Sequence, residues 1–159
     1  MKNIFFILAI LIIGNSANAD SRFGDLTEMR DERMRGKDGK WVRPHPGPFI
    51  WNGIEREQGV FNWEETDKYV VYAQKHNQNT IATIWPHANW EQKSCKRRKA
   101  NSPFGRKFTK YLSKPCSMDN YKNFLIKLLD RYDGNGINDM PGLTKPIKHW
   151  QIMNEPEYK

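Results

Sequence analysis

The spacing of apolar residues predicts one long amphipathic helix near the end of the chain. Between residues 121 and 132, apolar side chains recur every three or four positions, which places them on one face of a helix. Ser117 precedes this stretch as a suitable N-cap, and Asp133-Gly134 follows it as a helix end. The pattern therefore predicts a helix that begins behind Ser117 and buries one face.

Short runs of β-branched and aromatic residues predict strands. Thr80–Trp85 is followed directly by Pro86, and its continuous apolar character is typical of a strand buried on both faces. Further strands are predicted around residues 41 and 150, with another near 21–24. Prolines exclude a regular strand through 44–48, so this stretch is predicted to be a loop that leaves the strand around residue 41.

Two more helices are predicted between these strands. One covers 25–36, and the other begins at Asn62, where Glu65 completes a capping box, and ends near His76. The stretch from 89 to 117 has no such period and is predicted to be one long loop. Strands that alternate with helices favour an α/β fold, a single domain in which helical crossovers connect parallel strands.

The first 19 residues have the layout of a secretory signal peptide. Lys2 precedes an apolar run from Ile4 to Ile13, and Ala17-Asn18-Ala19 offers the small residues that signal peptidase requires. A membrane anchor is the alternative, but the run has half of the roughly 20 apolar residues needed to span a bilayer. We therefore expect cleavage after Ala19, a secreted or periplasmic protein without membrane attachment, and a mature domain of residues 20–159.

The net charge of +8 comes from one segment, residues 91–118, because the rest of the chain is neutral. Cys95 and Cys116 flank most of this segment, and an oxidising compartment allows them to pair, with two free buried thiols as the alternative. Basic residues that alternate with aromatic ones can bind nucleic acid or an anionic polysaccharide. In an exported protein we favour an acidic or sulfated glycan over nucleic acid, while a solvated loop is the simpler interpretation.

The chemistry is concentrated at the predicted carboxyl ends of the strands, where loops of parallel α/β folds converge on one crevice. Indole rings can stack on sugar rings, imidazole and amide groups can bind hydroxyls, and a carboxylic acid can protonate a glycosidic oxygen. These types of side chain, found together, predict a carbohydrate-binding site. The candidate residues are Arg43, His45, Trp85, His87, Trp90, Asn154 and Glu155.

Several of these residues fall within a family pattern. The string His149–Glu157, with Asn154-Glu155-Pro156 at its centre, resembles the fourth-strand signature of the clan A retaining (β/α)8-barrel glycoside hydrolases. Trp41-Val42-Arg43 and the stretch from Trp51 to Asp67 resemble the second strand and second helix of that clan. Arg131-Tyr132-Asp133-Gly134 resembles the approach to its fourth strand. The resemblance extends over about 120 residues in the same order.

The resemblance implies a TIM barrel and a division of roles. Glu155 would be the general acid/base, Asn154 would bind the substrate 2-hydroxyl, and Arg43 would support the catalytic carboxylates. His87, Trp90 and Trp85 would contact substrate. The clan's nucleophile is a glutamate on the seventh strand, about 5 Å from the acid/base. Barrels of this class need about 250 residues, so we expect an N-terminal fragment with the first four β/α units.

Other interpretations are weaker. Glu55, Glu57 and Glu157 are expected to be solvated loop carboxylates, which do not replace the nucleophile. The histidines share no metal-ligand spacing, and 133–144 lacks two ligands of a calcium loop, so neither a metal nor another cofactor is expected. A non-catalytic secreted module that binds carbohydrate or polyanion is the alternative function.

Overall fold

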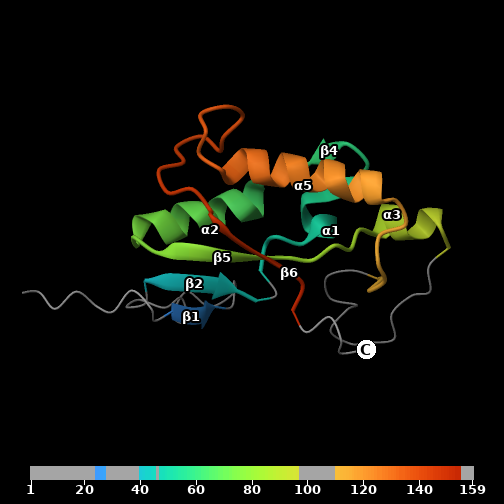
Figure 1. The fold of residues 1–159 in the computed structure, drawn as a ribbon, viewed down its shortest axis with the longest axis horizontal. Coiled ribbons are helices and arrows are strands. Elements are labelled where there is room, and N and C mark those ends of the chain that lie inside the picture. The colour runs from blue at the N-terminus through green and yellow to red at the C-terminus, as the bar shows by residue number, and fades with distance from the viewer. Residues whose placement is uncertain (1–23, 28–39, 46, 97–109, 155–159) are drawn as a thin grey trace, which may run out of the picture.

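Four parallel strands form the only sheet of that size among the residues described. The computed structural model describes residues 24–27, 40–45, 47–96 and 110–154. Hydrogen bonds connect the strands in the order β1-β2-β5-β6, and β2 therefore has β5 between it and β6. The strands are β1 (Gly24–Thr27), β2 (Trp41–Pro44), β5 (Asn79–Ile84) and β6 (His149–Ile152). All four run in one direction, so their carboxyl ends share one edge (Figure 1).

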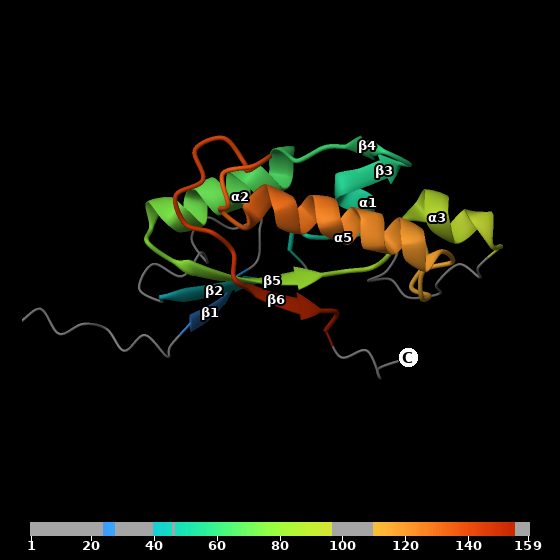
Figure 2. The same cartoon turned by 45° about the horizontal axis from the view of Figure 1, so that its top comes forward.

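Two crossover helices cover the same face of this sheet. They are α2 (Glu64–Lys75) and α5 (Met118–Tyr132), and both lie on one side of the strands in Figures 1 and 2. The core between the layers contains Ala82 and Ile84 of β5, Val70 of α2, and Phe124 and Leu128 of α5. None of the helices in the described ranges has the length and apolar character needed to cross a membrane.

Smaller elements gather beyond the carboxyl ends of β2 and β5. They are helix α1 (Trp51–Ile54), a hairpin of β3 (Glu55–Glu57) with β4 (Val60–Phe61), and helix α3 (Asn89–Ser94). Figure 2 shows them past the arrowhead of β5, next to the first turns of α5. This end of the molecule therefore contains the loops in which a site of a parallel α/β fold is expected.

Aromatic side chains fix the loop that follows β2. Phe49 is fully buried and makes edge-to-face contacts with Tyr69 of α2, Tyr132 of α5 and Trp150 of β6, with ring centroids about 6 Å apart. Trp51, also fully buried, stacks on Phe124 at 5.3 Å. The loop is therefore attached to both helices and to the last strand.

The principal elements predicted from the sequence are confirmed. Helix α5 begins behind Ser117, whose Oγ accepts a hydrogen bond from the backbone N–H of Asn120 at 3.2 Å, and the helix is followed by Asp133. The strands around 41, 82 and 150 are present, and β5 carries buried side chains on both faces. A first strand also exists, three residues later than expected, at Gly24–Thr27.

Three local predictions are wrong. A helix was predicted over 25–36, but residues 24–27 form strand β1, because they pair with β2. Residues 28–36 lie outside the described residues. The long loop begins with helix α3. Helix α2 has Trp63, not Asn62, as its N-cap residue. The Asn62 side chain still accepts a hydrogen bond from the backbone N–H of Glu64 at 3.0 Å. The predicted capping box is absent, because the Glu65 side chain contacts Lys68 instead.

Candidate functional site

Arg43 connects two strands that are not neighbours. Its Nε donates to Oε1 of Gln151 at 2.9 Å, and its Nη2 donates to Oδ1 of Asn154. Val42 points into the core beneath the helices, and side chains alternate along a strand, so Arg43 lies on the opposite face of the sheet. Because β5 separates β2 from β6, the guanidinium extends across β5 to reach its partners.

Asn154 is held just beyond the carboxyl end of β6. The backbone N–H of Met153 donates to the carbonyl of Ile84 at 2.9 Å, which continues the pairing with β5 past the end of the strand. Met153 has a positive φ of 58°, and this left-handed residue turns the chain before Asn154. Glu155, the predicted acid/base, lies outside the described residues, as does Glu157.

Trp85 lies where the loops after β2 and β5 pair with each other. Its carbonyl accepts from the backbone N–H of Trp51 at 3.0 Å, and its own N–H donates to the carbonyl of Phe49 at 3.2 Å. The half-buried indole of Trp85 has the ring of His45 at 5.9 Å and that of His87 at 6.2 Å. Trp85 is thus part of a ring cluster at the strand ends, on the strand that Arg43 crosses.

His87 is buried, with 1% of its surface exposed. Its Nδ1 lies 3.1 Å from the carbonyl oxygen of Ser113, so Nδ1 carries the proton and donates it. Its Nε2 is buried without a hydrogen-bond partner among the described residues, and burial lowers the pKa of the imidazole from its ordinary value. The side chain therefore connects the segment before α5 to the end of β5 as a neutral ring.

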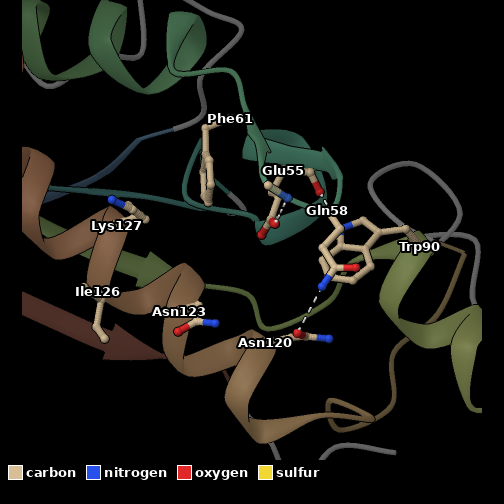
Figure 3. Close-up of a pocket in the computed structure, with 9 residues that line it drawn as sticks. Glu55, Gln58, Phe61, Trp90, Asn120, Asn123, Ile126 and Lys127 are labelled. Carbon is tan, nitrogen blue, oxygen red and sulfur yellow. Dashed lines mark hydrogen bonds between the residues drawn. The ribbon is translucent and has the colours of Figure 1, made fainter.

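Trp90 does not join the strand-end cluster. Its Nε1 donates to the carbonyl of Glu55 at 2.9 Å, and its ring meets the buried ring of Trp51 edge to face at 5.7 Å. It lines a pocket between the β3–β4 hairpin and α5, shown in Figure 3. The structure thus brings Arg43, Asn154 and Trp85 to one edge of the sheet but directs Trp90 elsewhere.

The expectation that Glu55 is a solvated loop carboxylate is wrong. Only 5% of Glu55 is exposed; its Oε2 accepts from the indole N–H of Trp51 at 2.5 Å, and its Oε1 accepts from the N–H of Gly59 at 2.7 Å. Gly59 has a φ of +78°, which suits glycine in the hairpin turn. Trp51 stands four residues before Glu55 and Gly59 four residues after it, and this spacing is the signal in the sequence for the arrangement. Glu57 is exposed, as expected, although it belongs to a strand.

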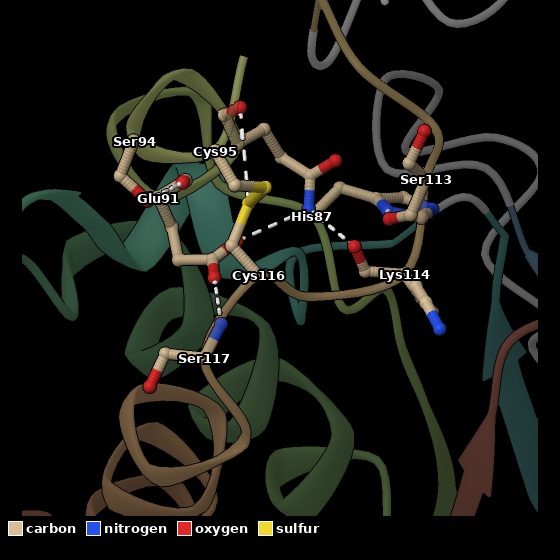
Figure 4. Close-up of a disulfide and its surroundings, with 9 residues drawn as sticks. His87, Glu91, Ser94, Cys95, Ser113, Lys114, Cys116 and Ser117 are labelled. Atoms are coloured by element: carbon tan, nitrogen blue, oxygen red, sulfur yellow. Dashed lines mark hydrogen bonds between the residues drawn. A yellow bond between two sulfur atoms is a disulfide. The ribbon is translucent and has the colours of Figure 1, made fainter. Parts of the chain in front are cut away.

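The predicted disulfide is confirmed. Cys95 follows α3 and Cys116 precedes α5, and their Cα atoms lie 5.8 Å apart (Figure 4). The described lysines of the basic segment, Lys93, Lys96, Lys110 and Lys114, are all exposed. The bridge therefore joins two helices from inside a cationic segment.

Beside the disulfide lies a buried acid that sequence reasoning missed. Glu91 is fully buried, and its Oε1 accepts from the backbone N–H of Ser117 at 2.6 Å, while Oε2 accepts from Nε2 of Gln92 at 3.1 Å. The negative charge lies at the N-terminus of α5, where the helix dipole stabilises it. Glu91 is thus a structural acid in the otherwise cationic segment.

In the loop after α5, acidic side chains accept hydrogen bonds from backbone groups of the same loop. The carboxylate of Asp139 accepts from the N–H groups of Gly134 and Gly136 at 3.0 and 2.7 Å. Within the described ranges, no three His, Cys, Asp or Glu side chains form a group that could hold a metal ion.

No protein-family model and no curated protein sequence matches the chain. The argument for its function therefore depends on its own geometry and on the sequence pattern.

Proposed function

We propose that this chain carries the acid/base half of a secreted glycoside hydrolase that cleaves a β-linked oligo- or polysaccharide with retention. One observation carries the proposal: Arg43 reaches across β5 to hydrogen-bond Asn154, the residue before Glu155. A charged side chain from one strand end thus holds the residue that precedes the proposed acid/base in the sequence. The family resemblance gives Arg43 the role of supporting the catalytic carboxylates and Asn154 that of binding the 2-hydroxyl, and this hydrogen bond connects the two side chains.

The arrangement of strands supports a (β/α)8 barrel with its first four units in this chain. Four strands are parallel, consecutive strands are neighbours once the small hairpin is set aside, and both crossover helices cover one face. In a barrel the other face forms the interior, and that is where Arg43 and Gln151 meet. The strand-end position of Asn154 then corresponds to the catalytic end of the barrel.

The geometry assigns the atoms of Asn154. Because the guanidinium of Arg43 donates to Oδ1, the amide is oriented with its Nδ2 hydrogens available as donors. In the proposed mechanism these hydrogens bind the substrate 2-hydroxyl, while Glu155 protonates the departing glycosidic oxygen and then activates water. Trp85 provides an indole at the same edge on which a sugar ring can stack.

A retaining mechanism also needs a nucleophilic carboxylate about 5 Å from the acid/base. Glu55 and Glu91 are buried and engaged in hydrogen bonds that hold the hairpin and α5, so neither is proposed for this role. The proposal assigns the nucleophile to the seventh-strand glutamate of the complete barrel, in agreement with the resemblance.

The test uses the longest open reading frame that contains these codons. Glu155→Gln should lower hydrolysis of an unactivated disaccharide by about 10²–10⁴-fold, and it should spare bond cleavage in an aryl glycoside whose leaving group needs no proton. Glu157→Gln is the matched control, two residues away, and should leave both substrates unaffected. The proposal fails if Glu155→Gln leaves both rates unchanged or if the product has inverted stereochemistry.

One observation favours a second function, a non-catalytic module that binds polyanions. Lys93, Lys96, Lys110 and Lys114 are exposed around the disulfide. Binding through these lysines would weaken steeply with salt, whereas stacking of a neutral sugar on tryptophan would hardly respond. Salt-sensitive binding of an anionic polysaccharide without hydrolysis would favour the module.

A further inference from the structure

A pocket of about 330 Å³ lies between the β3–β4 hairpin and helix α5, and neither Arg43, Trp85 nor Asn154 lines it. Its volume falls within the range usual for small-molecule sites. Trp90 of α3 closes one end, as Figure 3 shows. The buried ring of Trp51 contacts Trp90, while its backbone N–H binds the carbonyl of Trp85. This pocket is therefore separate from the cluster at the strand ends.

One wall of the pocket is a polar stripe on α5. Asn120, Asn123 and Lys127 are three and four residues apart, which places them on one flank of the helix, beside the buried Phe124. The Asn123 and Lys127 side chains are exposed and have no hydrogen-bond partner within the part of the chain that the structure describes. Asn120, Asn123 and Lys127 thus line the pocket, and two of these three side chains make no hydrogen bond to the described residues.

The opposite wall comes from the hairpin and α3. Gln58 extends toward α5 and donates to Oδ1 of Asn120 at 3.4 Å, a weak bond that a ligand can replace. The Trp90 indole N–H is already bonded to the Glu55 carbonyl, so the ring offers its face rather than a donor. Glu55 also lines the pocket, with its carboxylate bonded to Trp51 and Gly59. The pocket thus combines an aromatic platform with amide groups that both donate and accept.

The charges in the pocket select among ligand classes. The lining contains one acidic residue, Glu55, and one basic residue, Lys127, so it has no excess of either charge to select an ion. An apolar ligand would leave the amides of Asn123 and Gln58 without partners, which is costly. A neutral molecule rich in hydroxyl groups can bind the amides and lie against the indole face.

We propose that this pocket binds a neutral sugar residue of a polysaccharide, as a surface site separate from the strand-end cluster. This inference goes beyond the proposed hydrolysis and does not depend on it. A sugar in this pocket would attach the protein to a glycan chain while the strand ends remain accessible.

The test measures mobility of the purified chain in native gels that contain neutral polysaccharides of different backbone, namely glucan, mannan, xylan and galactan. We expect retardation in at least one gel, unchanged by added salt. Asn123→Ala and Lys127→Ala should each reduce retardation at least threefold. Lys122→Ala is the control, because Lys122 is exposed on α5 but absent from the pocket.

A second measurement does not depend on the variants. In a ¹⁵N spectrum, methyl glycosides of the retarding polysaccharide should shift the Asn123 side-chain amide and the Trp90 indole signals. The proposal would be overturned if none of the neutral gels retarded the protein, or if only a polygalacturonate gel did so and salt abolished the effect. Equal effects of Lys122→Ala and Lys127→Ala would overturn it too. Shifts confined to Trp85 would overturn it as well, by assigning the binding to the strand ends.

Discussion

Arg43 of β2 hydrogen-bonds Asn154, just beyond the end of β6, although strand β5 lies between β2 and β6. The same guanidinium binds Gln151, so one side chain of β2 connects the end of β6 to the sheet at two points. Planar guanidinium geometry makes this possible, because two of its nitrogens donate in fixed directions. The residue that precedes Glu155 therefore depends on Arg43 for its orientation.

Replacing Arg43 should show this dependence in stability. Arg43→Lys keeps the charge but cannot make both bonds, so we expect a loss of about 1–3 kcal/mol in the free energy of unfolding. Urea denaturation of Arg43→Lys, Asn154→Ala and the double variant should give a coupling of about 1 kcal/mol. Arg56→Lys, at an exposed arginine, is the control. Additive effects of the two substitutions would contradict the relationship.

Glu91 should stabilise the start of α5. Glu91→Ala leaves the Ser117 N–H and the Gln92 amide without this acceptor in a buried place, so we expect a loss of about 1–3 kcal/mol. Hydrogen exchange should quicken first at Ser117 and the first turn of α5. Glu57→Ala removes an exposed carboxylate and should change neither quantity; an equal effect of both substitutions would speak against the buried contact.

The bridge between Cys95 and Cys116 should contribute to stability, because it closes a loop of 21 residues. Replacing both cysteines with serine should lower the free energy of unfolding by roughly 3 kcal/mol. Peptide mapping without reduction should recover one linked peptide pair. Two cysteines that alkylate before reduction would refute the pairing.

Stability should depend on pH through His87. Burial lowers its pKa from 6.5 in the folded protein, so below about pH 6.5 the unfolded chain binds a proton that the folded chain does not. The free energy of unfolding should therefore fall as the pH drops from 6.5 towards the lowered pKa, by up to about 1.4 kcal/mol per pH unit. His87→Gln should flatten this slope, measured by urea denaturation at pH 5 to 7.

A histidine at the end of α2 provides the control. His76 is exposed, and His76→Gln should retain the slope of the parent protein. Because His87→Gln also removes a buried contact, the comparison concerns the slopes and not the absolute stabilities. Equal slopes in all three proteins would exclude His87 as the origin of the pH dependence.

The predicted signal peptide implies a defined N-terminus. Export should remove residues 1–19 and leave Asp20 first, because Ala17 and Ala19 provide the small residues that the peptidase needs. Intact-mass measurement of protein recovered from the medium or periplasm checks this, and Ala19→Arg should block cleavage. A mature form that begins at Met1 would contradict the prediction.

The sequence by itself determined the elements whose signals are local. The apolar period and the Ser117 cap specify α5, and the β-branched run before Pro86 specifies β5, because both depend only on neighbours along the chain. The disulfide was also predictable, since the chain has two cysteines and the predicted export would allow them to pair. The helix predicted at residues 25–27 was wrong, because hydrogen bonds to β2, and not the local sequence pattern, make this segment a strand.

Only the tertiary structure decided which polar groups are buried and which candidates meet. Glu55 and Glu91 have the sequence context of surface acids, yet both are buried, because partners contributed by the Gly59 turn and by Ser117 satisfy their carboxylates. Trp90 follows the same strand as Trp85 but lines a pocket to which Trp85 does not contribute, since its ring packs on Trp51 and its indole N–H bonds to the Glu55 carbonyl. Arg43 meets Asn154 because the strand order brings residues 111 positions apart within reach of one side chain, and no local pattern encodes that order.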